Sequence, residues 1–416
     1  MAEKGSNGWL SSALVMALAG AAVPAAGQTP ESVTIPLQVV NVPSVGTKVG
    51  IRVGLGGGPP KLYTFDTGSS GMYAAYNPAW WPSFTPLGGL PISQSYGSNL
   101  ALTADAVSTV ITIPTDHGEL SITADVGQIV SAGGNADGEA WMANVAAGIP
   151  PLYGMFYGDF GSGLTKPPKG LFAVLPQLPG NLSSGFAVQL GCSGGGPESK
   201  VVVGLTPAIR ARVTSWVKME AEPDAPPYPQ SHRPSYTQAL VAGSYSLARP
   251  GASYDFSAPT ILDTGGGTAD IHQASPLVVP DALLDAGKNR VLSGTQFSLK
   301  APGTAGSNDL DMSFVTGSTS TIDLVTVSQA KPPSSGGQPK PEVNVGLVPF
   351  FRYDIVFDVE RGNVGFAPCT AAAPVANAPI PTLSTWAIGL LAAALALVGA
   401  FATTLRTPRR SRHDRG

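Results

Sequence analysis

The sequence predicts an all-β protein built from two related halves. Glycine and proline are abundant, with 51 and 39 residues, while charged residues make up only 12% of the 416-residue chain. This composition favours strands joined by many turns over a helical bundle. In addition, an apolar segment runs into Asp-Thr-Gly twice, at residues 62–68 and 260–265, each near the start of its own half. The repeat predicts a duplicated β lobe.

The N-terminus has the layout of a secretory signal peptide. Lys4 precedes an apolar stretch at 9–23, and small residues follow at 25–27. This order of charged, apolar and small residues predicts export, with residues 1–27 removed. An uncleaved anchor helix is the alternative, which the short apolar core disfavours.

The C-terminus has the layout of a membrane anchor. A linker rich in proline and alanine at 371–385 leads into an uncharged apolar run at 386–405, long enough to span a bilayer. A basic tail at 406–416 follows, and the positive-inside rule places it in the cytoplasm. The body of the chain is therefore expected outside the cytoplasmic membrane, in agreement with a signal peptide.

The linker contains Ile-Pro-Thr-Leu-Ser at 380–384, directly before the apolar run. This motif, followed by the span and the basic end, resembles the IPTL-type C-terminal sorting signals of Gram-negative bacteria. The resemblance implies processing by an exosortase-like membrane enzyme and a location at the cell envelope or outside the cell. A plain C-terminal anchor is the alternative.

Several other classes of protein find no support in the composition. The formal net charge is −3, and positive charge gathers in the C-terminal tail, so no nucleic-acid surface is predicted. The four histidines lack the spacing of metal ligands, so no metal site is predicted, and His272 is expected to be structural. The two cysteines of an exported chain predict one disulfide.

The repeated Asp-Thr-Gly motif offers the carboxyl groups of Asp66 and Asp263 to one reaction. Two carboxyl groups held close together share one proton over a wide pH range, because ionising both is unfavourable. The ionised one can draw a proton from a water molecule while the protonated one polarises a carbonyl group. The glycine after each threonine lets the backbone turn tightly and bring the loops together. The pair predicts hydrolysis by water without a covalent intermediate.

Over residues 33–370 the chain resembles the pepsin-like aspartic peptidase family. Residues 65–70, Phe-Asp-Thr-Gly-Ser-Ser, match the family's first catalytic loop, and residues 53–61 resemble the hairpin before it. Residues 344–358 and 362–368 resemble the family's last stretch, where two apolar residues and a glycine support the second aspartate.

The segment 94–98, Gln-Ser-Tyr-Gly-Ser, resembles the tip of the family's flap, a β-hairpin that closes over substrate. The resemblance implies that Tyr96 and Gly97 contact substrate. An ordinary hairpin tyrosine is the alternative, because the spacing from Asp66 is shorter than is usual in the family. Tyr73, seven residues after Asp66, stands where the family commonly has tryptophan and is expected at the same site.

The resemblance implies an all-β, bilobal fold with two barrel-like lobes, at 28–185 and 186–370, and a substrate cleft between them. It implies a monomeric aspartic endopeptidase that hydrolyses polypeptides, with Asp66 and Asp263 catalytic and no metal or organic cofactor. Two threonines would brace the loops against each other and a serine would orient Asp66. The supporting residues are Thr67, Gly68, Ser69, Thr264 and Gly265.

The resemblance also implies a disulfide between Cys192 and Cys369. Each cysteine stands just after an apolar segment, 186–190 or 364–368, that is expected in the sheet joining the lobes. The glycine that supports the first catalytic loop stays open between two residues, Gly154 and Gly158.

The chain departs from the family at Gly266, where threonine or serine usually offers a hydroxyl to the second aspartate. Loss of that bond disfavours the ionised form of Asp263, so activity is expected to be weakened or shifted in pH. A second function is therefore a weakly active or inactive pepsin-fold protein that binds polypeptide or polysaccharide at the cell surface. The pair at 80–81, Trp-Trp, fits either a substrate groove or buried core, and residues 329–342 are expected to form a flexible surface insertion.

Overall fold

The computed structural model describes residues 30–369, apart from residue 44 and the segments 166–169, 192–197, 220–225, 237–238, 318–321 and 332–337. The predicted signal peptide, apolar span and basic tail lie outside the described residues, and so does part of the segment 329–342. In the part that is described, no helix is both long enough and apolar enough to cross a membrane.

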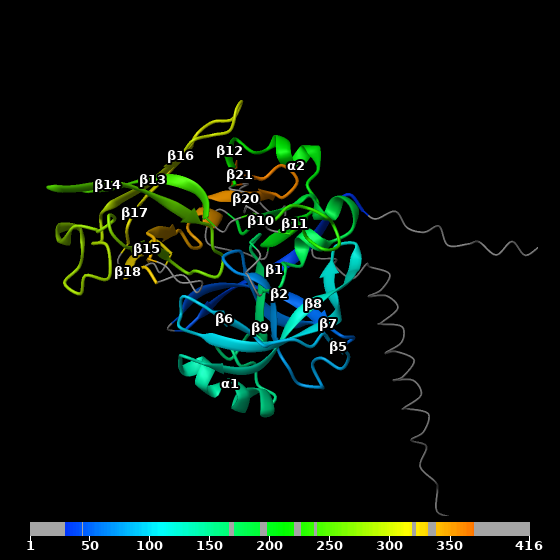
Figure 1. The fold of residues 1–416 in the computed structure, drawn as a ribbon. Coiled ribbons are helices and arrows are strands. Elements are labelled where there is room, and N and C mark those ends of the chain that lie inside the picture. The colour runs from blue at the N-terminus through cyan, green and yellow to red at the C-terminus, as the bar shows by residue number, and fades with distance from the viewer. Residues whose placement is uncertain are drawn as a thin grey trace, which may run out of the picture.

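The chain folds mostly into β-strands, as predicted, and the described strands form two sheets (Figure 1). The larger sheet has 14 strands, of which β6 pairs with β7 beside the main path, and the smaller has seven. Alternating polarity selects the strand faces. In β17 (Leu310–Val315), for example, Leu310, Met312 and Phe314 are buried while the residues between them are exposed.

The elements follow one another along the chain with these bounds. The first half contains β1 (Val33–Val42), β2 (Gly46–Leu55), β3 (Lys61–Asp66), β4 (Ser70–Ala75), β5 (Thr85–Pro86), β6 (Ile92–Ser95), β7 (Ala101–Thr115), β8 (Gly118–Gly133), α1 (Ala136–Ala146) and β9 (Gly158–Ser162). The middle contains η1 (Leu175–Gln177), η2 (Gly180–Ser184), β10 (Phe186–Gln189), β11 (Lys200–Val203), α2 (Pro207–Ala211) and β12 (Ser215–Lys218). The remainder contains β13 (Ala239–Arg249), β14 (Ala252–Ile261), β15 (Ala269–Gln273), η3 (Asp281–Leu283), β16 (Gln296–Ala301), β17, β18 (Val325–Gln329), β19 (Glu342–Asn344), η4 (Pro349–Phe351), β20 (Tyr353–Asp358) and β21 (Asn363–Pro368).

The same three-stranded arrangement occurs twice, once in each half of the chain. In the first half, β9 lies between β3 and β4, parallel to β3 and antiparallel to β4. In the second, β19 lies between β14 and β15 with the same directions. A fourth strand extends each group in parallel, β8 beside β4 and β18 beside β15. The repeat predicted from the Asp-Thr-Gly pair is therefore present in the strand topology.

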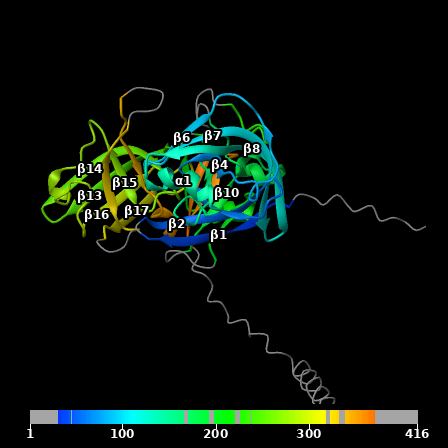
Figure 2. The same ribbon diagram turned by 90° about the horizontal axis from the view of Figure 1, so that it is seen from below.

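Strands from the two ends of the chain share one region of the larger sheet. The order there is β12, β21, β20, β10, β11 and β1, so the last strands lie in the same sheet as the first. The other strands of the first half continue from β1, whereas β13 to β19 form the smaller sheet. Figure 2 shows these two groups on opposite sides of the molecule. The predicted lobe boundary at 185–186 coincides with the start of β10.

An apolar core runs through both groups of strands. Phe65 and Phe160 stack with ring centroids 6.3 Å apart directly behind the first Asp-Thr-Gly loop. Trp80 and Trp81 are only 8% and 1% exposed. Trp81 donates its indole N–H to Thr109 Oγ1 at 3.0 Å, which satisfies its polar atom in the interior. The tryptophan pair therefore belongs to the core rather than to a substrate groove.

A buried ion pair fastens α2 to the shared region of the larger sheet. Asp358, the last residue of β20, has a side chain that is 0% exposed. Arg210 of α2 donates to both of its oxygens, from Nε at 2.7 Å and from Nη2 at 3.2 Å. Because removing one partner leaves an uncompensated buried charge, this pair is expected to be sensitive to substitution.

We expect Arg210→Met to lower the free energy of unfolding by about 3 kcal/mol, since methionine keeps the apolar length but leaves Asp358 without its bidentate partner. Urea unfolding of the full chain in mild detergent, followed by tryptophan fluorescence, measures the change. Arg361→Met is the matched control, because Arg361 Nε lies 3.9 Å from the same carboxylate and its side chain is 58% exposed. Its expected loss is below about 0.5 kcal/mol. Equal losses in the two variants would contradict the prediction.

Candidate active site

Asp66 and Asp263 meet where the two repeated strand groups face each other. Asp66 is the last residue of β3, and Asp263 follows the end of β14. Reciprocal bonds join their loops: the N–H of Thr67 donates to Thr264 Oγ1 at 3.0 Å, and the N–H of Thr264 donates to Thr67 Oγ1 at 3.1 Å. Each hydroxyl donates in turn to the carbonyl of the residue before the opposite aspartate, at 2.8 and 2.6 Å. The two threonines therefore brace the loops against each other.

Gly68 and Gly265 allow the carboxyl groups to approach. A Cβ on Gly68 would lie 2.5 Å from Cγ of Asp263, and a Cβ on Gly265 would lie 2.6 Å from Cγ of Asp66. Both distances are far inside van der Waals contact, so only glycine fits at these positions. The carboxyl groups of Asp66 and Asp263 come close enough to share a hydrogen bond.

Asp66 is held by backbone N–H groups. Its Oδ1 accepts from Gly68 at 2.7 Å and from Ser69 at 3.1 Å. The hydroxyl of Ser69, expected to orient Asp66, donates instead to Oδ2 of Asp159 at 2.6 Å. That expectation is wrong because Asp159 on β9 lies within reach of the hydroxyl and offers it a carboxylate. Ser69 consequently bridges Asp66 and Asp159, with its N–H on one and its hydroxyl on the other.

Asp263 is held by one backbone group and one side chain. Its Oδ1 accepts the N–H of Gly265 at 2.7 Å, and its Oδ2 accepts from Asn344 Nδ2 at 2.6 Å. Gly266 offers no hydroxyl, but a Cβ there would already lie 3.0 Å from Asp263 Oδ2 and 3.3 Å from Asn344 Oδ1. The amide of Asn344 therefore fills the space that a serine at 266 would use. Gly266 supplies no hydroxyl to Asp263, as expected, but the amide of Asn344 supplies a side-chain bond in its place, which sequence reasoning did not foresee.

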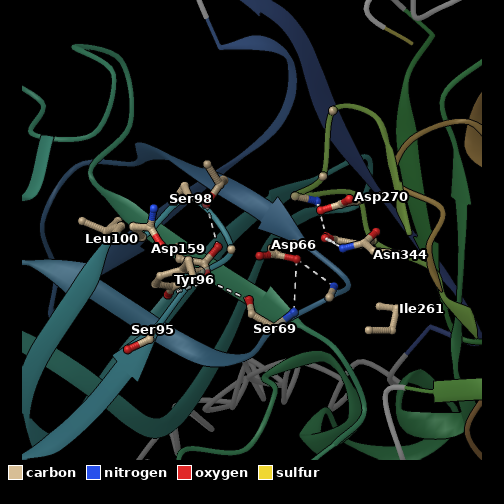
Figure 3. A pocket seen from close by; sticks show the side chains of 18 of the residues that line it. Asp66, Ser69, Ser95, Tyr96, Ser98, Leu100, Asp159, Ile261, Asp270 and Asn344 are labelled. Carbon is tan, nitrogen blue, oxygen red and sulfur yellow. Dashed lines mark hydrogen bonds between the residues drawn. The ribbon is translucent and has the colours of Figure 1, made fainter. Parts of the chain in front are cut away.

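The hairpin formed by β6 and β7 carries Tyr96 at its tip, close to Asp159 and Ser69 (Figure 3). The N–H of Tyr96 donates to the carbonyl of Leu100 at 2.9 Å and closes the turn, in which Gly97 is exposed. The Tyr96 hydroxyl donates to Asp159 Oδ2 at 3.0 Å. Tyr73 is 0% exposed and packs in the core with Leu100. Tyr96 and Gly97 thus face the site, whereas Tyr73 supports the hairpin from the interior.

The hairpin, the two aspartate loops and the edge of the smaller sheet enclose a cavity of about 720 Å³. Asp66, Asp263, Tyr96 and Gly97 all line it. The hairpin tip also touches the second half of the chain, where Lys331 Nζ donates to Asn99 Oδ1 at 2.9 Å. The cavity is therefore covered on one side by the hairpin and large enough for a ligand of several residues.

Burial and negative neighbours favour a proton at this site. Burial, Asp263 and Asp159 together hold the pKa of Asp66 well above its usual range. Burial also raises the pKa of Asp159 to about 6, against the lowering effect of hydrogen bonds from Ser69, Thr64 and Tyr96. The site therefore retains a carboxyl proton at pH values at which an unperturbed aspartate is ionised.

The opposite wall of the cavity carries His272 on β15. Its Nε2 lies 3.1 Å from Asp270 Oδ2 and its Nδ1 lies 2.8 Å from Glu342 Oε1. Burial lowers the pKa of His272, but the bonds to these carboxylates outweigh it and raise the pKa to about 9. The imidazole is therefore a cation at neutral pH that pairs two carboxylates, in keeping with the structural role expected for it.

Asp159 and Asn344 are site residues that sequence reasoning did not single out. Strand register places them equivalently, because Asp159 is opposite Thr64 and Asn344 is opposite Ile261, each two residues before an aspartate of the pair. A polar-apolar-glycine triplet, at 159–161 and 344–346, is the signal in the sequence. It becomes visible only once the two strands are known to be equivalent.

The same register identifies the glycine beside the first Asp-Thr-Gly loop. Gly161 is paired with Asp66, and a Cβ on it would lie 2.5 Å from the carbonyl oxygen of Gly71. Gly158 only begins β9, and Gly154 lies in the preceding loop with open space around it. Neither of the two glycines considered from the sequence therefore takes this position, which falls to Gly161.

Two other sequence-based expectations concern metals and cysteines. Over the described ranges, no group of three or more histidine, cysteine, aspartate or glutamate side chains is arranged to hold a metal ion. Cys369 directly follows β21, but Cys192 lies outside the described residues. The disulfide between them stays a prediction.

Comparison with known families identifies the C-terminus. Residues 378–410 match the IPTL-CTERM motif, which covers the Ile-Pro-Thr-Leu sequence, the apolar run and the start of the basic tail. The predicted sorting signal is confirmed, and it marks the chain as a protein of the cell envelope or exterior that an exosortase-like enzyme processes. No curated protein matches the chain.

We expect Thr264→Val to lower the free energy of unfolding by about 2–4 kcal/mol. Valine keeps the shape, but it leaves the N–H of Thr67 and the carbonyl of Phe65 unpaired around a side chain that is 0% exposed. Thr264→Ser keeps the hydroxyl and loses one methyl group, so its expected cost is about 1 kcal/mol. Urea unfolding of both variants measures the difference. A valine variant as stable as the serine variant would show that the brace contributes little.

Proposed function

We propose that the chain is an aspartic endopeptidase with a two-lobed, pepsin-like fold. The observation that carries the proposal is the meeting of two Asp-Thr-Gly loops, from equivalent strand groups, so that Asp66 and Asp263 share a hydrogen bond at the floor of a cavity. The reciprocal bonds of Thr67 and Thr264 hold this geometry. A hairpin with Tyr96 at its tip covers the same cavity, which supports a polypeptide as the substrate.

The reaction we propose is attack of a water molecule on a peptide carbonyl. One carboxyl group of the pair keeps a proton because burial and nearby negative charge disfavour its loss. It donates this proton to the carbonyl oxygen, while the ionised partner takes a proton from the water. Activity is lost at high pH when the shared proton leaves, and at low pH when both groups are protonated. The proposed reaction needs no metal or organic cofactor.

We further propose that the body is exported through the signal peptide at 1–27 and stays at the envelope of a Gram-negative cell until the C-terminus is processed. Strands β10 and β21 run in the same direction on either side of β20, so their C-terminal ends lie at one edge of the sheet, about 10 Å apart. This placement supports the proposed disulfide between Cys369 and Cys192, whose segments follow those ends.

Proteolysis of denatured casein tests the proposed activity. The full chain in mild detergent is expected to cleave casein between pH 3 and 7 and to be inhibited by pepstatin. Asp66→Asn and Asp263→Asn are each expected to lower the rate at least about 100-fold, because each removes one acid–base group. Asp105→Asn, on the exposed face of β7, is the matched control and should cleave like the wild type. A folded wild type that cleaves at no pH would favour the surface-binding function instead.

A cellular experiment tests the role of the C-terminus. In a Gram-negative host with an exosortase-like enzyme, the full chain is expected in the envelope fraction as a form shortened at its C-terminus, whereas a chain ending at 377 should appear in soluble form. Pro381→Ala changes the motif but keeps the apolar run, so this variant should remain membrane-bound and unshortened. Mass spectrometry of each fraction measures the result. Shortening of the Pro381→Ala variant at the wild-type rate would contradict recognition of the motif.

A further inference from the structure

The two repeated strand groups carry side chains of the same shape but opposite hydrogen-bonding character at one equivalent position. We call Asp66 and Asp263 the dyad. Asp159 on β9 is paired with the residue two positions before Asp66, and Asn344 on β19 is paired with the residue two positions before Asp263. Aspartate and asparagine differ only by replacement of an oxygen with an NH₂ group, which turns an acceptor into a donor. The two carboxyl groups of the dyad therefore have equivalent backbone frames but unlike neighbours.

Asp159 is surrounded by hydroxyl donors. Its Oδ1 accepts from Thr64 Oγ1 at 2.6 Å, and its Oδ2 accepts from Ser69 at 2.6 Å and from Tyr96 at 3.0 Å. The residue is only 3% exposed, so these hydroxyls take the place of water. Three donors to one carboxyl group favour its ionised form. Burial still raises the pKa of Asp159 to about 6, so above that pH Asp159 places a buried negative charge beside Asp66, to which Ser69 connects it.

The donors are absent from the equivalent positions of the second group. Ile261 stands where the first group has Thr64, and Gly266 stands where it has Ser69. Asn344 correspondingly needs no such donors, because its Oδ1 accepts the N–H of Gly346 at 2.9 Å. This bond fixes the orientation of the amide and directs Nδ2 to Asp263 Oδ2 at 2.6 Å. An N–H donor on that oxygen favours the ionised form of Asp263.

We propose that Asp159 and Asn344 are positioning residues that give the dyad a fixed polarity, with the shared proton on Asp66 and the negative charge on Asp263. Asp159 achieves this by placing charge beside Asp66, and Asn344 by donating to Asp263. The inference rests on the proposed function for its consequence in catalysis, whereas the location of the proton is a property of the resting site.

The other charged and titratable groups around Asp159 do not reverse this polarity. Tyrosine hydroxyls from the hairpin, from β4 and from the loop before β9 stay neutral at physiological pH. The Lys48 ammonium group donates to the carbonyl of Gly265 and lies 5.7 Å from the centre of the Tyr153 ring, so it lies beside the second Asp-Thr-Gly loop. The groups that face Asp159 or its dyad neighbours are Asp66, Asp263, Tyr73, Tyr96, Tyr153 and Lys48.

The polarity assigns the two chemical roles. The water oxygen bonds to the peptide carbonyl carbon, its proton passes to Asp263, and the proton of Asp66 passes to the carbonyl oxygen, giving a neutral gem-diol. In the second step Asp263 returns its proton to the amide nitrogen, the C–N bond breaks, and Asp66 recovers a proton from one hydroxyl as the carboxylic acid forms. Each aspartate ends the cycle in its starting state.

Carboxyl-carbon NMR of the full chain in mild detergent, labelled with ¹³C at the aspartate carboxyl groups, tests the location of the proton without requiring turnover. Difference spectra against Asp66→Asn and Asp263→Asn identify the two dyad signals. We expect Asp66 to titrate at the higher pH. Asp159→Asn should move its midpoint down by about 1 pH unit or more, because a negative neighbour is lost. Asn344→Asp adds a charge at the equivalent position and should move the later dyad midpoint up by a similar amount.

Asp270→Asn is the matched control, because Asp270 lines the same cavity but bonds His272 and Ser328 rather than the dyad. It should move the Asp66 midpoint by less than about 0.3 pH unit. A wild-type dyad in which Asp263 holds the proton, or an Asp159→Asn midpoint equal to that of the wild type, would overturn the inference. Should Asp159→Asn fail to fold, the order in which Asp66 and Asp263 titrate in the wild type decides it.

Activity separates this inference from the proposed function. If the wild type cleaves casein, the high-pH limb of the rate should shift downward in Asp159→Asn and upward in Asn344→Asp. If the wild type cleaves nothing but Asp66 titrates at a higher pH than Asp263, the peptidase proposal fails and the polarity of the dyad stands. If the wild type cleaves casein but Asp263 titrates at the higher pH, the peptidase proposal stands and the proposed polarity of the dyad is wrong.

Discussion

The site depends on the reciprocal contact between Thr67 and Thr264. The two loops follow β3 and β14, which belong to different sheets. The local sequence of either loop does not specify the distance between the two loops. Four hydrogen bonds between the threonines and the opposite backbone set that distance. The bonds are buried, so water cannot replace them when they break, and each orphaned group would cost free energy. The geometry of the carboxyl groups follows from this brace.

Bringing the carboxyl groups together creates an electrostatic cost that the surroundings must offset. Asp66 and Asp159 are 8% and 3% exposed, and Asp263 lies within hydrogen-bonding reach of Asp66, so three carboxyl groups lie close together and two of them are buried. Full ionisation of such a cluster is unfavourable because charges of one sign repel strongly in the interior. The structure offsets part of this cost with hydroxyl, amide and backbone donors. A retained proton offsets the rest, and this proton is also what the proposed hydrolysis requires.

The sequence predicts the parts of the site that lie close together along the chain. Asp-Thr-Gly read with the apolar segment before it predicts two equivalent loops, and the resemblance of residues 94–98 to a flap tip implies a covering hairpin. Sequence reasoning misses Asp159 and Asn344 because their contacts depend on pairing with strands roughly 80 to 100 residues away, which local patterns do not encode. The partner of the Ser69 hydroxyl is misassigned for the same reason, since Asp159 becomes a neighbour only when β9 inserts between β3 and β4.

A duplicated strand arrangement poses a problem for acid–base chemistry, because equivalent surroundings would give the two aspartates the same proton affinity. Here the repeated strands place the two aspartates equivalently, and three pairs of unlike side chains make their surroundings differ. Thr64, Ser69 and Asp159 in the first half correspond to Ile261, Gly266 and Asn344 in the second. The three differences are related. In the first half, the hydroxyl groups of Thr64 and Ser69 donate to the carboxylate of Asp159. In the second half, where the equivalent residue is an amide, neither equivalent position carries a hydroxyl group. Gly266 is then not a defect in the second loop. It leaves room for the amide of Asn344, which a hydroxyl at that position would crowd.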